Sequence, residues 1–523
     1  MNNVRLDEVE KELPLTHEQI IEILLEMATK TKKQKSYIKH HYRGLKSQYD
    51  FLKSLFGELP DCEFTVIVHI ISCQVFEYKK GNNGWVAIPA ATIQKYCKGA
   101  KMLNLVDNGY LELKVIDELS QHTYSKTCGI CRSYKVADNI VDEFINLGDI
   151  STQEYLDAKK VNLFTGKPTK KINKTIVKDD SNNYFPALIR EAMLAINNCI
   201  IEIEPVEKHL ANLKTNMDLL AWTEGMDSPE YITARGQYYN DRSCLNAALD
   251  QDAIEVLPGF LTFVPAYTPV STGRIQTPLQ NASREMKEAA FSNVENLKNY
   301  DLRSSQAIGL IQQFELAGLD TSWLERYKDN KKAKYEYSTQ IGISVDTWKR
   351  CLCALLMGGS LPKRALEESS SSVMNYLMEE ADGDFIQAAE YLSKFTEVVK
   401  PLKEQIDLWH NWLLEEYCLK IGTRVKGKLY IKNPTGITLC VDELPDGKQI
   451  WKRKSTIAAF FLQGQEAALI HNLTTLSLEY DYKVLQNEHD GLITIGIIPS
   501  EAVERASLMS NMKYVSLEEK PFV

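Results

Sequence analysis

Two acidic residues far apart in the chain have the surroundings of metal ligands. Asp301 lies at a predicted strand end, and the polar turn 303–306 leads from it into an apolar stretch predicted to be helical, with Ala307, Ile308, Leu310 and Ile311 buried. Asp490 lies between two apolar segments in a turn that a β-hairpin would display. A carboxylate at a strand end is a rigid hard-oxygen ligand, whereas many such Asp residues only cap helices or form turns.

A lysine lies between these two carboxylates in the sequence. Trp348-Lys349-Arg350 opens an apolar stretch that ends at Met357-Gly358-Gly359, which predicts a helix with Lys349 near its start. Two carboxylates that bind a divalent cation, together with a lysine that pairs with phosphate, are suited to phosphoryl transfer. That reaction depends mainly on positioning and on charge neutralisation.

Further polar motifs surround these residues in a fixed order. They are Thr272-Gly273-Arg274, Pro278-Leu279-Gln280-Asn281, the helix start Phe461-Leu462-Gln463-Gly464-Gln465-Glu466, and His489 beside Asp490. In order and character, the motifs resemble those of the family A nucleic-acid polymerases, the single-subunit right-hand enzymes, over roughly residues 190–523. The resemblance implies a multidomain α+β fold with palm, fingers and thumb, and a DNA polymerase that extends a primer 3′-hydroxyl with dNTPs.

The resemblance also implies roles for individual residues. Asp301, Asp490 and Lys349 would be catalytic, and Asp301, the Leu302 carbonyl and Asp490 would hold two Mg²⁺ ions, with Mn²⁺ able to substitute. The expected nucleotide-binding residues are Gln306, Lys349, Arg350, Cys353 and Met357. The expected primer–template contacts are Arg274, Gln280, Asn281, Gln463 and His489. The expected partners are therefore a DNA primer–template and nucleoside triphosphates.

Several positions depart from the family pattern. Gln306 stands where these DNA polymerases usually have glutamate, Met357 replaces an aromatic residue, and Val345 replaces an arginine. Lys349-Arg350 and Asn433-Pro434-Thr435-Gly436, in a predicted hairpin, look more like phage-type RNA polymerases. The choice between dNTPs and NTPs therefore stays open, with Gln306 as the residue expected to decide it.

Length and composition indicate the general class of protein. The chain has 523 residues, a net charge of −9 and 44% hydrophobic residues, which indicates several folded domains and no overall polyanion-binding character. Eleven scattered cysteines indicate reduced thiols. The first residues have no apolar signal core and no run reaches membrane-spanning length, so we expect a cytoplasmic protein without a membrane partner.

The first part of the chain is predicted to bind DNA. Residues 1–60 are expected to be helical, and the basic stretch 30–46 is either a solvated helix face or a phosphate-contacting arm. Residues 61–150 show a helix at 63–78, a short helix at 100–108 and a hairpin of 110–116 with 130–136, an order that resembles winged-helix modules. Lys98 and Lys101 are the expected DNA contacts, for origin or template DNA, although protein docking is an equal alternative.

Other segments are less specific. Cys128 and Cys131 form a C-x-x-C, with His122 and Cys97 as the nearest further ligands; an incidental pair is favoured over zinc. Residues 151–182 are a lysine-rich linker, and 183–265 are expected to hold two long thumb-like helices, the first running from Ile189 to Ile200. Residues 266–523 would be palm and fingers.

Three functional hypotheses follow from these patterns. The first is a DNA polymerase without a proofreading exonuclease, in phage, plasmid or mobile-element replication. The second is a single-subunit RNA polymerase or primase-like enzyme. The third is a non-catalytic DNA-binding initiator on a degenerate polymerase fold.

Overall fold

The computed structural model describes residues 42–79, 83–89, 93, 97–114, 131–169, 186–251, 253–263, 268–269, 271–365, 371–441, 454–488 and 490–521. Within them the fold is mixed α+β and multidomain, with helices predominant. No helix of this part of the chain is both long and apolar enough to cross a membrane. His122, Cys128 and His489, together with the expected helix before residue 42, fall outside the described residues.

The N-terminal part consists of helices around two small antiparallel pairings. A three-stranded sheet has the order β2-β4-β3, and β1 pairs with β5. The predicted helices at 63–78 and 100–108 are confirmed, as is the described part of the hairpin, in which Glu112 pairs with Lys135. The elements are β1 (Arg43–Leu45), α2 (Lys46–Phe56), α3 (Asp61–Lys79), β2 (Val86–Ala87), α5 (Met102–Asp107), β3 (Glu112–Leu113), β4 (Ser133–Lys135), α6 (Asp138–Asn146), α7 (Thr152–Asp157) and β5 (Lys160–Asn162).

The next segment differs from the prediction of two long helices. Its elements are α9 (Ala187–Ala195), β6 (Cys199–Glu202), α10 (Ile203–Thr223), α11 (Pro229–Leu249), β7 (Ile254–Leu257) and β8 (Phe260–Phe263). The expectation of one helix from Ile189 to Ile200 is wrong, because the helix ends at Ala195 and Ile200 lies in β6, where it pairs with Thr262 of β8. β-Branched residues suit this strand, and the pairing partner lies too far along the chain for a local pattern to reveal it.

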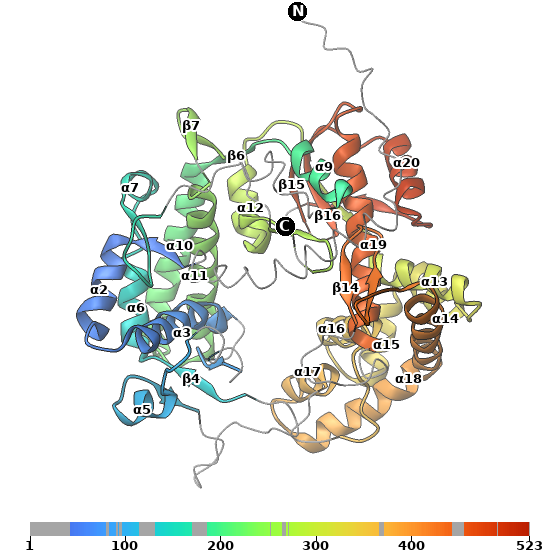
Figure 1. Ribbon diagram of the computed structural model, residues 1–523, viewed down its shortest axis with the longest axis horizontal. Coiled ribbons are helices and arrows are strands. Elements are labelled where there is room, and N and C mark those ends of the chain that lie inside the picture. Colours follow the sequence, from blue (N-terminus) through green and yellow to red (C-terminus); the bar gives the residue numbers. More distant parts are fainter. Residues whose placement is uncertain are drawn as a thin grey trace, which may run out of the picture.

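α10 and α11 pack together, and α3 packs on α11, so the first part and this segment share one hydrophobic core. Figure 1 shows these helices side by side, α3 in blue and α10 and α11 in green. α12 and one face of the β15–β16 hairpin extend the same core. The N-terminal part is thereby joined to the remainder by packing as well as by the chain.

The last part contains a helical body and a four-stranded sheet. Up to the helical body the elements are β9 (Thr268–Pro269), β10 (Ile275–Gln276), the 3₁₀-helix η3 (Pro278–Asn281), α12 (Arg284–Phe291), β11 (Leu297–Leu302), α13 (Ser305–Ala317), α14 (Ser322–Asp329), α15 (Ala333–Ile341), α16 (Val345–Leu356), α17 (Ser372–Glu380) and α18 (Phe385–Trp412). Then follow the π-helical η4 (Leu413–Ile421), β12 (Thr423–Val425), β13 (Lys428–Lys432), β14 (Thr438–Cys440), α19 (Lys454–Leu476), β15 (Lys483–Asn487), β16 (Gly491–Ile495), α20 (Ser500–Ser510) and β17 (Leu517–Glu519). α13 to α18 surround a second core, at the lower right of Figure 1.

The four-stranded sheet has the order β15-β16-β11-β17, with every neighbour antiparallel. Tyr300 and Leu302 of β11 point into a core shared with α19 and α20. Because side chains alternate along a strand, Asn299 and Asp301 lie on the opposite face. The predicted hairpins at 484–493 and around 433–436 are confirmed, whereas α19 begins at Lys454, earlier than the expected start near Phe461.

Candidate active site

Asp301 and Asp490 lie at the ends of adjacent strands. Asp301 pairs in register with Gly491, and the Leu302 N–H donates a hydrogen bond to the Asp490 carbonyl (2.8 Å). Any side chain at Gly491 would place its Cβ 2.1 Å from the Tyr300 carbonyl oxygen, so only glycine allows this close approach. The structure therefore brings the two predicted carboxylates together at one end of the sheet.

Two further carboxylates, Glu466 of α19 and Glu488 of the β15–β16 turn, flank this pair. Burial raises the pKa of Asp490 to about 7, and the negative charges of Glu466 and Asp301 add to that effect. Burial likewise raises the pKa of Glu466 and of Glu488, with a further contribution from Asp301 to each. Four acidic groups thus share one electrostatic environment that favours the arrival of a cation.

Three cations of the chain neutralise part of this charge. Arg274 forms an ion pair with Glu466, which also accepts a hydrogen bond from Ser305 Oγ (2.8 Å). Lys287 Nζ lies 2.8 Å from Glu488 Oε2. Lys520, at the end of β17, forms an ion pair with Asp301.

Asp490 differs from the other three carboxylates in its ion pairing. Among the residues that the structure describes, no cation forms an ion pair with its carboxylate. Burial is the main cause of its raised pKa, the negative charges of Glu466 and Asp301 raise the pKa further, and the positive charge of Arg274 only partly opposes them. A bound cation would therefore stabilise the ionised form of this carboxylate more than that of the other three.

The Thr272-Gly273-Arg274 motif is held by two distant segments. Gly273 has a φ of +92° and packs directly on Thr435, which leaves no room for a side chain. Asn433 Nδ2 donates to the Thr272 carbonyl (2.8 Å), and buried His471 Nε2 lies 2.8 Å from the Gly273 carbonyl. The turn at 433–436 is thus a structural support that fixes the backbone of Arg274, a role that its sequence did not reveal.

Three expected nucleotide-binding residues, Gln306 of α13 with Cys353 and Met357 of α16, lie near one another and near Gln463 of α19, an expected primer–template residue. Ser304, in a left-handed conformation (φ 50°), turns the chain from β11 into α13, where Ser305 contacts Glu466 and Gln306 is the next residue. Cys353 Sγ donates to Gln306 Oε1 (3.4 Å), and Gln463 Nε2 is 4.0 Å from Met357 Sδ. Residues from three helices therefore line one approach to the carboxylates.

Lys349 and Arg350 behave differently although they are neighbours. Lys349 is exposed and lies one helical turn before Cys353, on the α16 face that leads toward Gln306. Arg350 pairs with Glu379 (2.7 Å) and lies over the Tyr376 ring, 4.1 Å from its centroid, so its guanidinium faces α17. Of the two basic groups, Lys349 is the one that remains available to a ligand.

The expected primer–template residues divide in a similar way. Gln280 is buried, with Oε1 accepting from the Thr277 N–H (3.3 Å), so its side chain supports η3 instead of facing a ligand. Asn281 is exposed beside it, and the Gln280 carbonyl accepts from Lys287 Nζ (3.0 Å). In the N-terminal part, Lys98 and Lys101 are both exposed, far along the chain from this cluster.

The cluster is not a self-sufficient metal cage. Within the described ranges, no group of three or more His, Cys, Asp and Glu side chains is arranged to hold a metal ion. Mg²⁺ differs from many metals in this respect, because it is usually bound by one or two carboxylates together with substrate phosphates and water. Asp301 and Asp490 carry hard oxygen donors of the kind that such a site uses.

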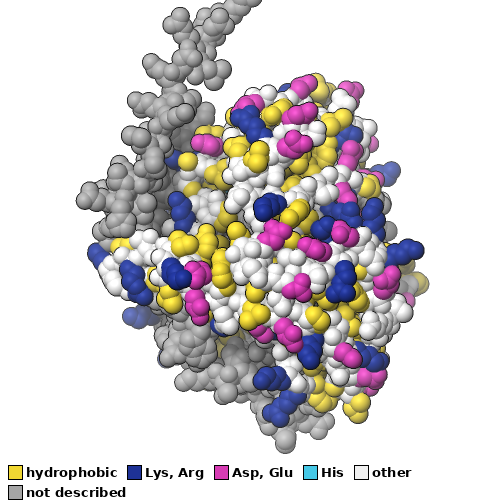
Figure 2. Space-filling view, turned by 90° about the vertical axis from the view of Figure 1, so that its right-hand side faces the viewer, with side chains coloured by type: hydrophobic (Ala, Val, Ile, Leu, Met, Phe, Trp, Pro, Cys, Tyr) yellow, Lys and Arg dark blue, Asp and Glu magenta, His cyan; other side chains and the backbone are white. Residues whose placement is uncertain are grey.

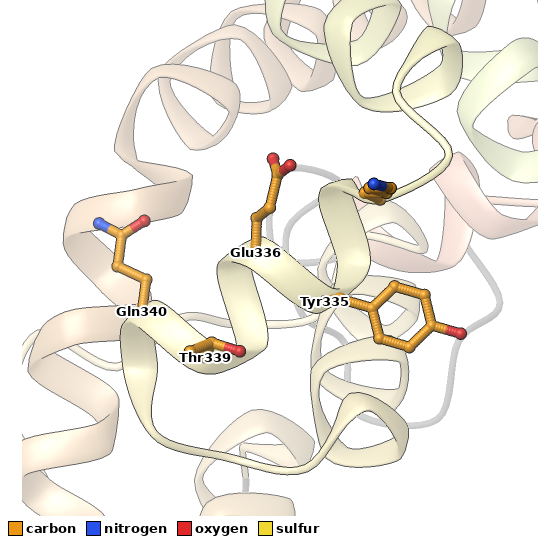
Figure 3. A pocket seen from close by; sticks show the side chains of 5 residues that line it. Tyr335, Glu336, Thr339 and Gln340 are labelled. Atoms are coloured by element: carbon orange, nitrogen blue, oxygen red, sulfur yellow. The ribbon is translucent and has the colours of Figure 1, made fainter.

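Surface features elsewhere do not coincide with the cluster. An open hollow of about 730 Å³ lies on α15, lined by Lys332, Tyr335, Glu336, Thr339 and Gln340 (Figure 3), and none of the predicted site residues lines it. On the face shown in Figure 2, the Lys and Arg side chains of the described residues are interspersed with Asp and Glu. That face lacks the continuous positive potential that binds a nucleic-acid backbone.

The main omissions of the sequence-based prediction are Glu466, Lys287 and Lys520. Glu466 carried a usable signal, because it is a carboxylate followed directly by the apolar residues 467–470 of a predicted helix. Lys520 carried none, since it becomes part of the site only through the pairing of β17 with β11.

Comparisons with known proteins do not assign a family. No protein-family model matches the chain, and no curated protein matches it. Among solved structures, the polymerase domain of Pol1 from M. smegmatis, in complex with DNA primer-template and dNTP, aligns over 73% of this chain and 73% of that chain, with 12% identity and a TM-score of 0.39. A likeness at that level assigns neither fold nor activity, so the site residues must carry any functional conclusion.

Proposed function

We propose that the chain is a template-directed nucleotidyltransferase, a DNA polymerase that extends a primer 3′-hydroxyl with dNTPs. The observation that carries the proposal is the meeting of Asp301 and Asp490 at adjacent strand ends, with Asp490 lacking an ion-pair partner among the described residues. Their donor set fits Mg²⁺, which would be held by both carboxylates and the Leu302 carbonyl. When bound, such cations activate the attacking hydroxyl and stabilise the leaving pyrophosphate.

The other residues have roles that follow from their places. Lys349, exposed on the α16 face toward Gln306, pairs with the triphosphate and protonates the leaving group. Gln306, Cys353 and Met357 line the nucleotide site, and Gln306 restricts the ribose 2′ position. Arg274 holds Glu466 in the acidic cluster and so shapes the charge around Asp490.

The duplex is held by groups on the approach to the cluster. Asn281, Gln463 and His489 contact the primer–template by its shape, which needs no base sequence. Lys98 and Lys101 of the N-terminal part contact origin or template DNA. We further propose that the enzyme lacks 3′–5′ proofreading and serves the replication of a phage, plasmid or other mobile element.

A nucleotide-incorporation assay tests the proposal. Purified full-length protein is given a labelled primer–template, Mg²⁺ and either dNTPs or NTPs, with Mn²⁺ in a parallel series. We expect template-dependent extension with dNTPs. Efficient synthesis from NTPs alone would instead establish an RNA polymerase or primase-like enzyme, and DNA binding without any incorporation would establish the non-catalytic initiator.

A further inference from the structure

The C-terminal strand places a lysine at the candidate metal site. β17 pairs with β11 in a register that sets Glu518 opposite Asp301, and the Lys520 N–H donates to the Asn299 carbonyl (2.8 Å). Directly paired residues project to the same face of a sheet, and so do residues two apart in a strand. Asp301 and Lys520 therefore share a face, and their side chains form an ion pair across the strands.

Lys520 differs from the other two cations in how readily it can leave. Its side chain is 46% exposed, whereas the side chains of Arg274 and Lys287 are only 16% and 12% exposed. Withdrawing either of these mostly buried cations would leave the carboxylate of Glu466 or Glu488 without its ion-pair partner in a place with little access to water. The Lys520 side chain can turn into the solvent at a small cost in free energy, because an exposed ion pair contributes little to stability.

We propose that Lys520 is a built-in counter-cation that occupies the Asp301 carboxylate until a divalent cation displaces it. The Lys520 ammonium group and the metal ion compete for the same carboxylate. The apparent affinity for metal is therefore the intrinsic affinity multiplied by the fraction of molecules in which the Lys520–Asp301 ion pair is open. Lys520 thereby sets the concentration of divalent cation at which the site fills. The inference rests on the proposed function in one respect, that Asp301 is a metal ligand.

Direct binding of Mn²⁺ to the full-length protein tests this competition, without any need for catalysis. Free Mn²⁺ is measured by electron paramagnetic resonance as protein is titrated, for wild type, Lys520→Ala and Lys520→Arg. Lys298→Ala is the matched control, because Lys298 pairs with Glu519 (2.8 Å) between the same two strands but lies on the other face of the sheet. Asp301→Ala reports whether the bound Mn²⁺ uses the candidate site.

We expect Lys520→Ala to bind Mn²⁺ about two- to fivefold more tightly than wild type, as the loss of a partly exposed ion pair allows. Lys520→Arg and Lys298→Ala should bind as wild type does. If Asp301→Ala weakens Mn²⁺ binding but Lys520→Ala binds Mn²⁺ as wild type does or more weakly, the inference about Lys520 is wrong while the metal site of the proposed function stands. If Asp301→Ala leaves Mn²⁺ binding unchanged, the metal site of the proposed function fails and the inference fails with it.

Discussion

Replacement of Arg274 by alanine tests whether the acidic cluster is held together as described. The Arg274 guanidinium is the cation paired with Glu466, whose side chain is only 4% exposed. Removing one partner of a buried pair leaves an uncompensated charge, which costs about 3 kcal/mol. For a cooperative domain of about 150–250 residues, 1 kcal/mol shifts the melting temperature by about 2–4 °C, so the transition of the domain that carries this pair should fall by about 6–12 °C.

The pH dependence of that loss identifies its cause. Burial already raises the pKa of Glu466, and Arg274 opposes this effect, so in Arg274→Ala the pKa of Glu466 should rise further. A carboxyl group whose folded-state pKa lies above its unfolded value favours folding below the unfolded value, and this contribution is lost as pH rises through the folded value. Relative to wild type, the variant should therefore be least stable at alkaline pH and recover as pH falls.

Scanning calorimetry at several pH values measures this difference. Arg350→Ala is the control, because it breaks the exposed pair with Glu379 and should cost at most about 1 kcal/mol. A second variant, Arg274→Ala with Glu466→Gln, removes the stranded charge and should recover part of the loss. A loss in Arg274→Ala that matches Arg350→Ala, or that does not change with pH, would refute the assignment of Arg274 to Glu466.

Three other predictions concern the surroundings of the site. Gly358→Ala should lower the free energy of unfolding by about 3 kcal/mol in melting experiments, because its φ is +81° and the new Cβ would lie 2.8 Å from Ser455 Cα. Gly383→Ala, at a positive φ but with open space around the new Cβ, should lower it by only about 1 kcal/mol. Burial lowers the pKa of His471 from 6.5 to about 4, so stability should fall as pH decreases between these values, and His471→Gln should flatten that part of a calorimetric pH profile. Gln306→Ala should raise the incorporation of NTPs relative to dNTPs by about tenfold or more in single-nucleotide extension, and no change would remove Gln306 from sugar selection.

The elements that carry the site could be predicted because their patterns are local. The apolar segments around Asp490 and the segment that ends at Asp301 predicted strands, which the structure confirms as β15, β16 and β11. The same holds for the helix that carries Lys349, confirmed as α16. For the hairpin around Asp490 and for α16, the apolar residues together with turn-forming residues at the ends were sufficient.

The contacts between elements could not be predicted in the same way. Arg274 and Glu466 are separated by 192 positions, and nothing in either segment indicates the other as its partner. Lys520 enters the site only because the tail pairs with β11, and Ile200 joined a strand because β8 lies beside it. Pairings that depend on tertiary structure also explain why Arg350 and Gln280 proved to be engaged elsewhere.

In the proposed function, Asp301 and Asp490 act together in nucleotidyl transfer. The most direct measurement is single-turnover primer extension by Asp301→Asn and Asp490→Asn, which keep side-chain size and remove charge, with DNA binding measured in parallel. We expect each substitution to lower the rate by at least about a thousandfold, equivalent to about 4 kcal/mol of lost transition-state stabilisation, while DNA affinity stays near that of wild type. Extension at the wild-type rate by either variant would contradict the proposed function.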